Sequence, residues 1–322
     1  MSCAASGEGL TAARLGVLYN LDDAASTQVA LYYVQQRAIP QENIIGVHLP
    51  NEKSMSPDAF MSLRARVLDQ LPAEVQSLVL VWSRPYAVGC MSITTAFAAG
   101  YRSDFCPPGC VRTPPNPLFN MDGWLPADTV GWWPAMLLPS KDPELARALI
   151  RRGIAADGSR PPGTLYLVRT DDALRNVRAA TYGDLEMALD RRVRVAQLTT
   201  PIAQQIPDAV GYFTGVTQVA ELPLIHFRPG AVADHLTSSG GVLEGGNQMP
   251  ALSWIAQGAT ASYGTVSEPC NLLGKFPDVS VLFGHYTRGE TVLEAYWKSV
   301  AMPGQGLFIG EPLSRPFAAR LE

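Results

Sequence analysis

Apolar and polar positions along the first third of the chain predict strands separated by helices. Compact apolar runs cover residues 14–20, 43–50 and 75–82, and each has the length of a buried strand. Between them, residues 25–37 and 57–71 carry apolar side chains at the three- and four-residue spacing of one helix face. Because strands joined in this order need crossover helices, the pattern predicts a doubly wound, mostly parallel α/β sheet.

Residues 84–162 interrupt this rhythm. The segment is rich in proline and tryptophan, and only its last part, residues 143–152, has the pattern of a helix. Such a segment is typical of a surface excursion, so we expect an insertion after the third strand that covers the carboxyl edge of the sheet. We expect residues 1–13 to be a flexible N-terminus and residues 14–322 to form a single α/β domain.

The strand–helix pattern resumes after the insertion. Gly230 to Cys270 is the part around which the chain is organised, because it predicts a strand, a glycine-rich loop, a helix and a second strand. The other predicted elements are helices within residues 173–190 and 285–300 and strands at 163–168, 193–198, 209–215 and 306–313.

The composition narrows the classes of function. Of the 322 residues, 47% are apolar and 17% are charged, which is typical of a packed globular protein and excludes disorder. The net charge of −4 gives no electrostatic reason to bind nucleic acid or an anionic membrane. No apolar run reaches the roughly 18 residues of a membrane span, and the first residues lack the pattern of a secretory signal.

The motifs predict neither a cofactor nor a metal. Gly240-Gly241 and Gly245-Gly246 do not fit a phosphate-binding or dinucleotide-binding pattern. The cysteines lack the C-x-x-C spacing and the nearby histidines of a zinc site. In an oxidising compartment, Cys106 and Cys110 are instead candidates for a short disulfide loop, and in a reducing one they stay free thiols.

The densest group of chemically useful side chains is the sequence Asp-His-Leu-Thr-Ser-Ser, which begins at Asp234. Ser238 and Ser239 stand between a predicted strand and a glycine loop, where nucleophiles often lie in open α/β sheets. Alternate residues of a strand share a face, so His235 is a candidate base for Ser239 or Thr237. The alternative is a buried, hydrogen-bonded histidine beside hydroxyls that cap a turn.

A second candidate group follows the strand after the glycine-rich loop. Glu268 directly follows that strand, so a parallel sheet places it at the carboxyl edge near Ser238, where it would orient a base or bind a substrate amine. Cys270 is an alternative nucleophile, since a thiolate is strong and a nearby histidine lowers the pKa of its thiol. The structural alternative is a turn carboxylate beside a small buried cysteine.

Charged residues follow several of the predicted strands. Because the carboxyl ends of parallel strands meet at one edge, we expect these arginines and carboxylates to converge there and to suit a peptide or another zwitterionic ligand. A network of ion pairs that pins loops is the alternative. The candidate ligand-binding residues are Asp22, Asp23, Arg84, Arg169, Asp234 and Glu268.

Several segments resemble an uncharacterised bacterial protein family that is found in genomes carrying the exosortase protein-sorting system. These segments include YNLDDAASTQVALYYVQQRAIP, LVLVWSRPYAVGC, GATASYGTVSEPCN and GQGLFIGEP, and the resemblance covers nearly the whole chain. It implies an exported, periplasmic protein, although no signal peptide is expected in this chain, and it implies no particular activity.

The chain also resembles, more distantly, the gingipain and caspase-like cysteine peptidases, in which one strand ends in His-Gly and a later strand ends in the nucleophilic cysteine. Here GYFTG (211–215) takes the position of the first motif, LTSS (236–239) that of the second and GEP (310–312) that of a closing turn. The resemblance implies a caspase-like fold, but the histidine and the cysteine are missing from these positions.

Two functions follow from these observations. The first is a protein of caspase-like fold that lacks the His/Cys dyad and binds a peptide or a partner protein in an export or surface-sorting pathway. The alternative is a peptidase-like hydrolase that uses Ser238 or Cys270 as its nucleophile.

Overall fold

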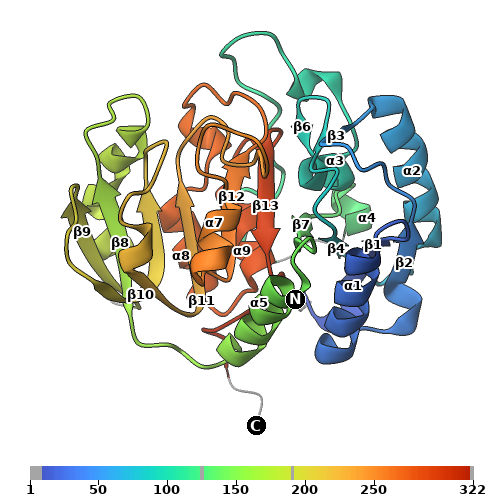
Figure 1. Ribbon diagram of the computed structural model, residues 1–322, viewed down its shortest axis with the longest axis horizontal. Helices are drawn as coiled ribbons and strands as arrows, with labels where there is room; N and C mark the ends of the chain where they lie inside the picture. Colours follow the sequence, from blue (N-terminus) through green and yellow to red (C-terminus); the bar gives the residue numbers. More distant parts are fainter. Residues whose placement is uncertain (1–8, 124–126, 190–191, 320–322) are drawn as a thin grey trace, which may run out of the picture.

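A computed structural model describes residues 9–123, 127–189 and 192–319 and is built around a ten-stranded sheet (Figure 1). Its strands are β1 (Leu15–Asn20), β2 (Ile44–Val47), β4 (Ser77–Val81), β7 (Ala135–Leu137), β8 (Thr164–Arg169), β9 (Arg194–Thr199), β10 (Ile206–Thr214), β11 (Ile225–His235), β12 (Ala261–Thr265) and β13 (Gly306–Gly310). They lie in the order β2-β1-β4-β7-β13-β12-β11-β10-β8-β9.

The pairing of these strands is mostly parallel, as predicted. β2, β1, β4 and β7 pair in parallel, and so do β9, β8, β10, β11 and β12. The last strand, β13, runs antiparallel to β12, with Tyr263 opposite Phe308. Helices flank the sheet, so the doubly wound α/β architecture expected from the sequence is confirmed (Figure 1).

The first third folds as the pattern of apolar residues predicts. Helix α1 (Ala24–Arg37) connects β1 to β2, and α2 (Pro57–Gln70) precedes β4. Asp23 caps α1 by accepting a hydrogen bond from the Ala25 amide, and Ser56 caps α2 with a proline at the first helical position. All five residues of β4 are buried, which explains its continuous apolar run.

The Pro- and Trp-rich segment contributes to the main sheet as well as to its surroundings. It holds β5 (Ala87–Val88) and β6 (Met91–Ser92), which form a small second sheet with β3 (Ser54–Met55), and then α3 (Ile93–Ala99) and α4 (Ala127–Val130). It also supplies β7 between β4 and β13, and α5 (Pro143–Ala156). We did not expect β7, because three residues between prolines and tryptophans give no readable strand period.

The second half contains the other differences from the expected elements. The helix expected at 173–190 is a 3₁₀ helix, η4 (Asn176–Asp184), followed by the short α6 (Leu185–Ala188). The helix expected within 285–300 is present as α9 (Val292–Ser299), which begins with a capping box at Thr291. A further helix that was not predicted, α8 (Val279–Tyr286), precedes it, and Gly289, with a φ of 95°, lies in the turn between them. The helix between β11 and β12 is α7 (Leu252–Gln257), as expected.

Candidate functional site

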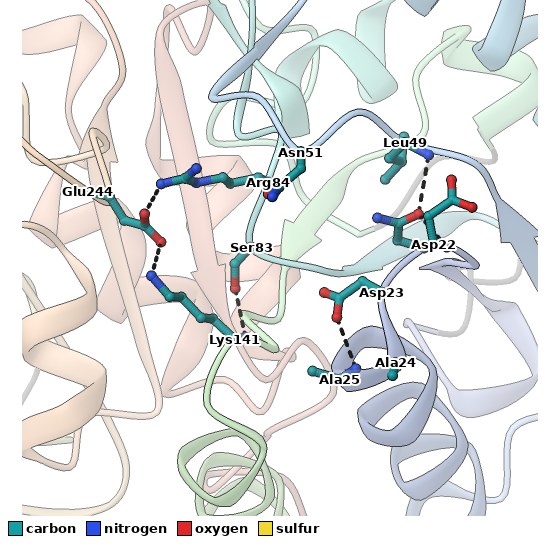
Figure 2. Close-up of a pocket in the computed structure, with 11 residues that line it drawn as sticks. Asp22, Asp23, Ala24, Ala25, Leu49, Asn51, Ser83, Arg84, Lys141 and Glu244 are labelled. Atoms are coloured by element: carbon teal, nitrogen blue, oxygen red, sulfur yellow. Dashed lines mark hydrogen bonds and ion pairs between the residues drawn. The ribbon is translucent and has the colours of Figure 1, made fainter.

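Loops from both halves of the sheet meet at its carboxyl edge. Arg84 follows β4, Lys141 follows β7, and Glu244 lies in the loop after β11. Both cations form ion pairs with the Glu244 carboxylate, with 2.9 Å between Lys141 Nζ and Glu244 Oε1 (Figure 2). These pairs hold the pKa of the Glu244 carboxyl below its ordinary value, and the hydrogen bond from Lys141 makes the largest contribution.

A first cavity of about 410 Å³ opens beside these ion pairs. It lies where the chain order reverses, between β1 and β4, which is the point at which open α/β sheets usually bind ligands. Figure 2 shows Arg84 and Lys141 beside Glu244 on one side of it and Asp22 and Asp23 on the other. The lining residues are Asn20, Asp22, Asp23, Ala24, Ala25, Leu49, Asn51, Ser83, Arg84, Lys141 and Glu244.

Local hydrogen bonds fix the loops that line the first cavity. The buried Asn20 side chain accepts hydrogen bonds through Oδ1 from the amides of Asp22, at 3.1 Å, and Leu49, at 3.2 Å. Ser83 Oγ accepts from the amides of Ser140 and Lys141, at 3.1 and 2.9 Å. The cavity is therefore preformed on four separate strand ends, which is how binding sites are usually positioned.

A second cavity of about 330 Å³ lies further along the same edge. It brings together Ser238, Glu268 and Cys270, which the sequence placed near one another, and adds Arg175 and Thr237. The guanidinium of Arg175 donates to Thr237 Oγ1 at 3.3 Å and pairs with Asp172 at 3.0 Å. Its other lining residues are Cys110, Leu174, Leu236, Pro269, Asn271 and Phe276.

The glycine-rich loop between β11 and α7 contributes to both cavities. Its start lines the second cavity through Ser238, and Glu244 reaches the first. The loop packs directly on the end of β12, where the Gly241 amide donates to the Thr265 carbonyl at 2.9 Å. A Cβ atom on Gly264 would lie 2.4 Å from the carbonyl carbon of Gly240, so this close approach requires glycine.

His235 is held as a buried, neutral histidine. Its Nε2 lies 2.9 Å from the Met249 carbonyl oxygen, and its Nδ1 accepts a hydrogen bond from the Trp254 indole at 3.0 Å. Burial lowers the pKa of this imidazole to about 4. Both ring nitrogens are engaged, so His235 has the geometry of the structural alternative.

The hydroxyls near His235 have another partner. Thr237 Oγ1 and Ser239 Oγ each donate to Gln248 Oε1, at 2.8 Å in both cases. The Ser239 amide donates to the same oxygen at 2.8 Å. Gln248 therefore organises this turn, while Ser238 is half-buried and faces the second cavity.

The four cysteines within the described residues form two disulfides, and the short Cys106–Cys110 loop expected from the sequence is wrong. Cys90 pairs with Cys106, and Cys110 pairs with Cys270. The two ends of the Cys-Pro-Pro-Gly-Cys segment face different loops, the β5–β6 turn and the turn after β12. As a disulfide sulfur, Cys270 Sγ carries no thiolate.

Of the remaining predicted ligand residues, Asp234 and Arg169 line neither cavity, whereas Glu268 lines the second. Asp234 is buried and pairs with Arg178, and burial raises the pKa of its carboxyl while Arg178 opposes the shift. The Arg169 guanidinium stacks 5.8 Å from the Tyr182 ring centroid and lines neither cavity. The Glu268 carboxylate lines the second cavity and accepts a hydrogen bond from the Cys270 amide at 2.7 Å.

Sequence reasoning missed Glu244, Lys141, Arg175 and Gln248. Glu244 carried a signal, because a single charged residue between two glycine pairs is unusual for a loop that only turns. The position of Lys141 at the first cavity had no signal in the sequence, because the short strand before it has no readable pattern. Within the described residues, no group of three or more His, Cys, Asp or Glu side chains has the arrangement of a metal site.

Among the comparisons with known proteins, one similarity bears on the fold. No protein-family model matches the sequence, and no curated protein is similar to it. A solved structure described as "Structure of Protease" superposes with a TM-score of 0.55 and 11% sequence identity, over 96% of this chain and 80% of that one. Across the described ranges, no helix has the length and apolar character needed to cross a bilayer.

Proposed function

We propose that this protein, whose fold is similar to that of a solved protease, binds a short peptide or a peptide segment of a partner protein at the carboxyl edge of its sheet. The observation that carries the proposal is the first cavity at the switch point between β1 and β4, where Arg84 and Lys141, which share the single carboxylate of Glu244, line one wall and Asp22 and Asp23 line the other. A zwitterionic ligand matches this separation of charge.

The charges assign an orientation to the ligand. An ammonium group would lie toward Asp22 and Asp23, and a carboxylate toward Arg84 and Lys141 (Figure 2). A carboxylate can accept two parallel hydrogen bonds from a guanidinium, and this geometry favours Arg84 as the main anchor. The cavity of about 410 Å³ falls in the usual range for small-ligand sites and suits about three residues of peptide.

The proposal places the protein among binding proteins and not among peptidases. The resemblance to cysteine peptidases puts Thr214-Gly215 and Thr237–Ser239 at the positions of the dyad. His235, the nearest predicted base, is hydrogen-bonded to the Met249 carbonyl and the Trp254 indole and not to a hydroxyl. Two disulfides fit an oxidising compartment, and with the family resemblance they support a role in export or surface sorting.

Calorimetric binding of a tripeptide pool with free termini, compared with the same pool acetylated and amidated, tests this function. The free pool should bind and the blocked pool should not, and affinity should fall as salt rises. Arg84→Gln and Asp22→Asn should each weaken binding about tenfold, the value of one charge-assisted hydrogen bond. Arg66→Gln, on the exposed face of α2, is the matched control and should change nothing. Equal binding by the two pools would refute the orientation.

The hydrolase alternative keeps one candidate, Ser238, because it faces a cavity together with Glu268. A serine-directed fluorophosphonate probe distinguishes the two functions. The binding proposal expects no labelling of native protein, whereas labelling of Ser238 that is lost on unfolding would favour a hydrolase.

A further inference from the structure

The wall of the second cavity includes a disulfide bond. Cys110 and Cys270 both line this cavity, together with Arg175, Glu268 and Ser238. The other disulfide, Cys90–Cys106, joins two half-buried residues and lines neither cavity. A small molecule in the second cavity would therefore touch one disulfide of the protein and not the other.

The two cysteines of the cavity disulfide differ in exposure. Cys110 is exposed, within an exposed run from Pro108 to Arg112, whereas Cys270 is partly buried. Thiolates attack the disulfide sulfur that they can reach, and the other sulfur leaves. The geometry therefore assigns Cys110 as the attacked sulfur and Cys270 as the leaving one.

The turn that carries Cys270 has an unusual backbone conformation. Its loop is joined to the Arg175 loop by a 3.0 Å hydrogen bond from Asn271 Nδ2 to the Leu174 carbonyl. Arg175 is paired with Asp172, and the Glu268 carboxylate accepts a hydrogen bond from the Cys270 amide, so the assignment of the leaving sulfur rests on exposure and on the backbone of this turn. Cys270 and Asn271 have φ values of 59° and 45°, a left-handed conformation that non-glycine residues rarely adopt. Opening the bond releases this turn from its covalent tether.

We propose that the second cavity is a thiol–disulfide exchange site for a small thiol-bearing ligand, such as a cysteine-containing peptide. The ligand thiol loses its proton to solvent, and its sulfur bonds to Cys110 Sγ. The Cys110–Cys270 bond breaks, its electron pair stays on Cys270 Sγ, and the products are a mixed disulfide and a Cys270 thiolate. No other oxidant or reductant takes part. This chemistry is independent of peptide binding in the first cavity.

Reduced glutathione is the probe for this exchange. The oxidised, full-length protein is incubated with it, free thiols are trapped with iodoacetamide, and the digest is mapped by mass spectrometry. We expect glutathione on Cys110 and the alkyl group on Cys270, with opening about tenfold or more faster than at Cys90–Cys106, as expected for an exposed disulfide. S-methylglutathione, which has no free thiol, is the matched control and should give no adduct.

Two variants and one spectrum complete the test. Ser238→Phe should fill the second cavity and slow adduct formation, whereas Ser159→Phe, at an exposed position outside both cavities, should not. The near-UV circular dichroism of the wild type reports that it stays folded, so the mapping does not depend on either variant. Absence of an adduct on folded protein, equal opening of both disulfides, or glutathione on Cys270 would each overturn the proposal.

Discussion

Replacing Glu244 by Gln removes the carboxylate that joins loops from the two halves of the sheet. Arg84 and Glu244 side chains are only 30% and 21% exposed, so their charge-assisted hydrogen bond contributes about 1.5–3 kcal/mol before any reduction by solvent screening. Lys141 is 72% exposed, and a pair of that kind contributes about 0.2–1 kcal/mol. Because glutamine still accepts hydrogen bonds, Glu244→Gln should lower the free energy of unfolding by about 1–2 kcal/mol near neutral pH.

The pH dependence of this loss identifies its cause. The folded pKa of Glu244 is lowered, so its contribution is present above the unfolded value of about 4.3 and disappears as pH falls through the folded pKa. Urea unfolding of wild type and variant should therefore differ at about pH 7 and converge at about pH 3. The same difference at both pH values would refute an electrostatic role for Glu244. In a cycle with Arg84→Gln, the coupling energy should be about 1 kcal/mol.

Three further predictions concern stability. His235→Ala should cost about 2–4 kcal/mol in urea unfolding, because it leaves a cavity and two unpaired partners, Met249 and Trp254; a loss under about 0.5 kcal/mol would contradict this. Since the pKa of His235 is about 4 when folded and about 6.5 when unfolded, wild-type stability should be full above about pH 6.5 and fall toward pH 4, a slope that His235→Ala should reduce. Gly264→Ala should lower the free energy of unfolding by about 1–3 kcal/mol, because its Cβ would meet Gly240; a melting temperature equal to that of the wild type would show that the loop yields freely.

The sequence predicts most strands of the sheet but not β7, which lies near its middle. The strands β1 and β4 are apolar runs next to clear helix signals, so their direction and shared edge follow from connection rules. β7 is three residues long, with no period to read, although it supplies the link between β4 and β13. A strand that short is specified by its neighbours rather than by its own pattern.

The sequence predicts only the parts of the site that follow from the order of strands along the chain. Ser238 and Glu268 follow neighbouring parallel strands, so their placement at one cavity could be read from order along the chain. The separation of Asp22 and Arg84 from them into a different cavity depends on the sheet order, which places β13 and β7 between the two groups. The roles of His235 and Cys270 depend on Trp254 and Cys110, whose proximity no local pattern shows.

The most direct test of the central claim is to photo-crosslink the free-terminus tripeptide pool, carrying a diazirine, to the native protein and to map the labelled residues. The account predicts labels on the strand-end loops that line the first cavity, around Asp22, Ser83 and Lys141, and competition by unlabelled free peptide but not by blocked peptide. Labels confined to other surfaces, or labelling that blocked peptide competes for equally well, would contradict it.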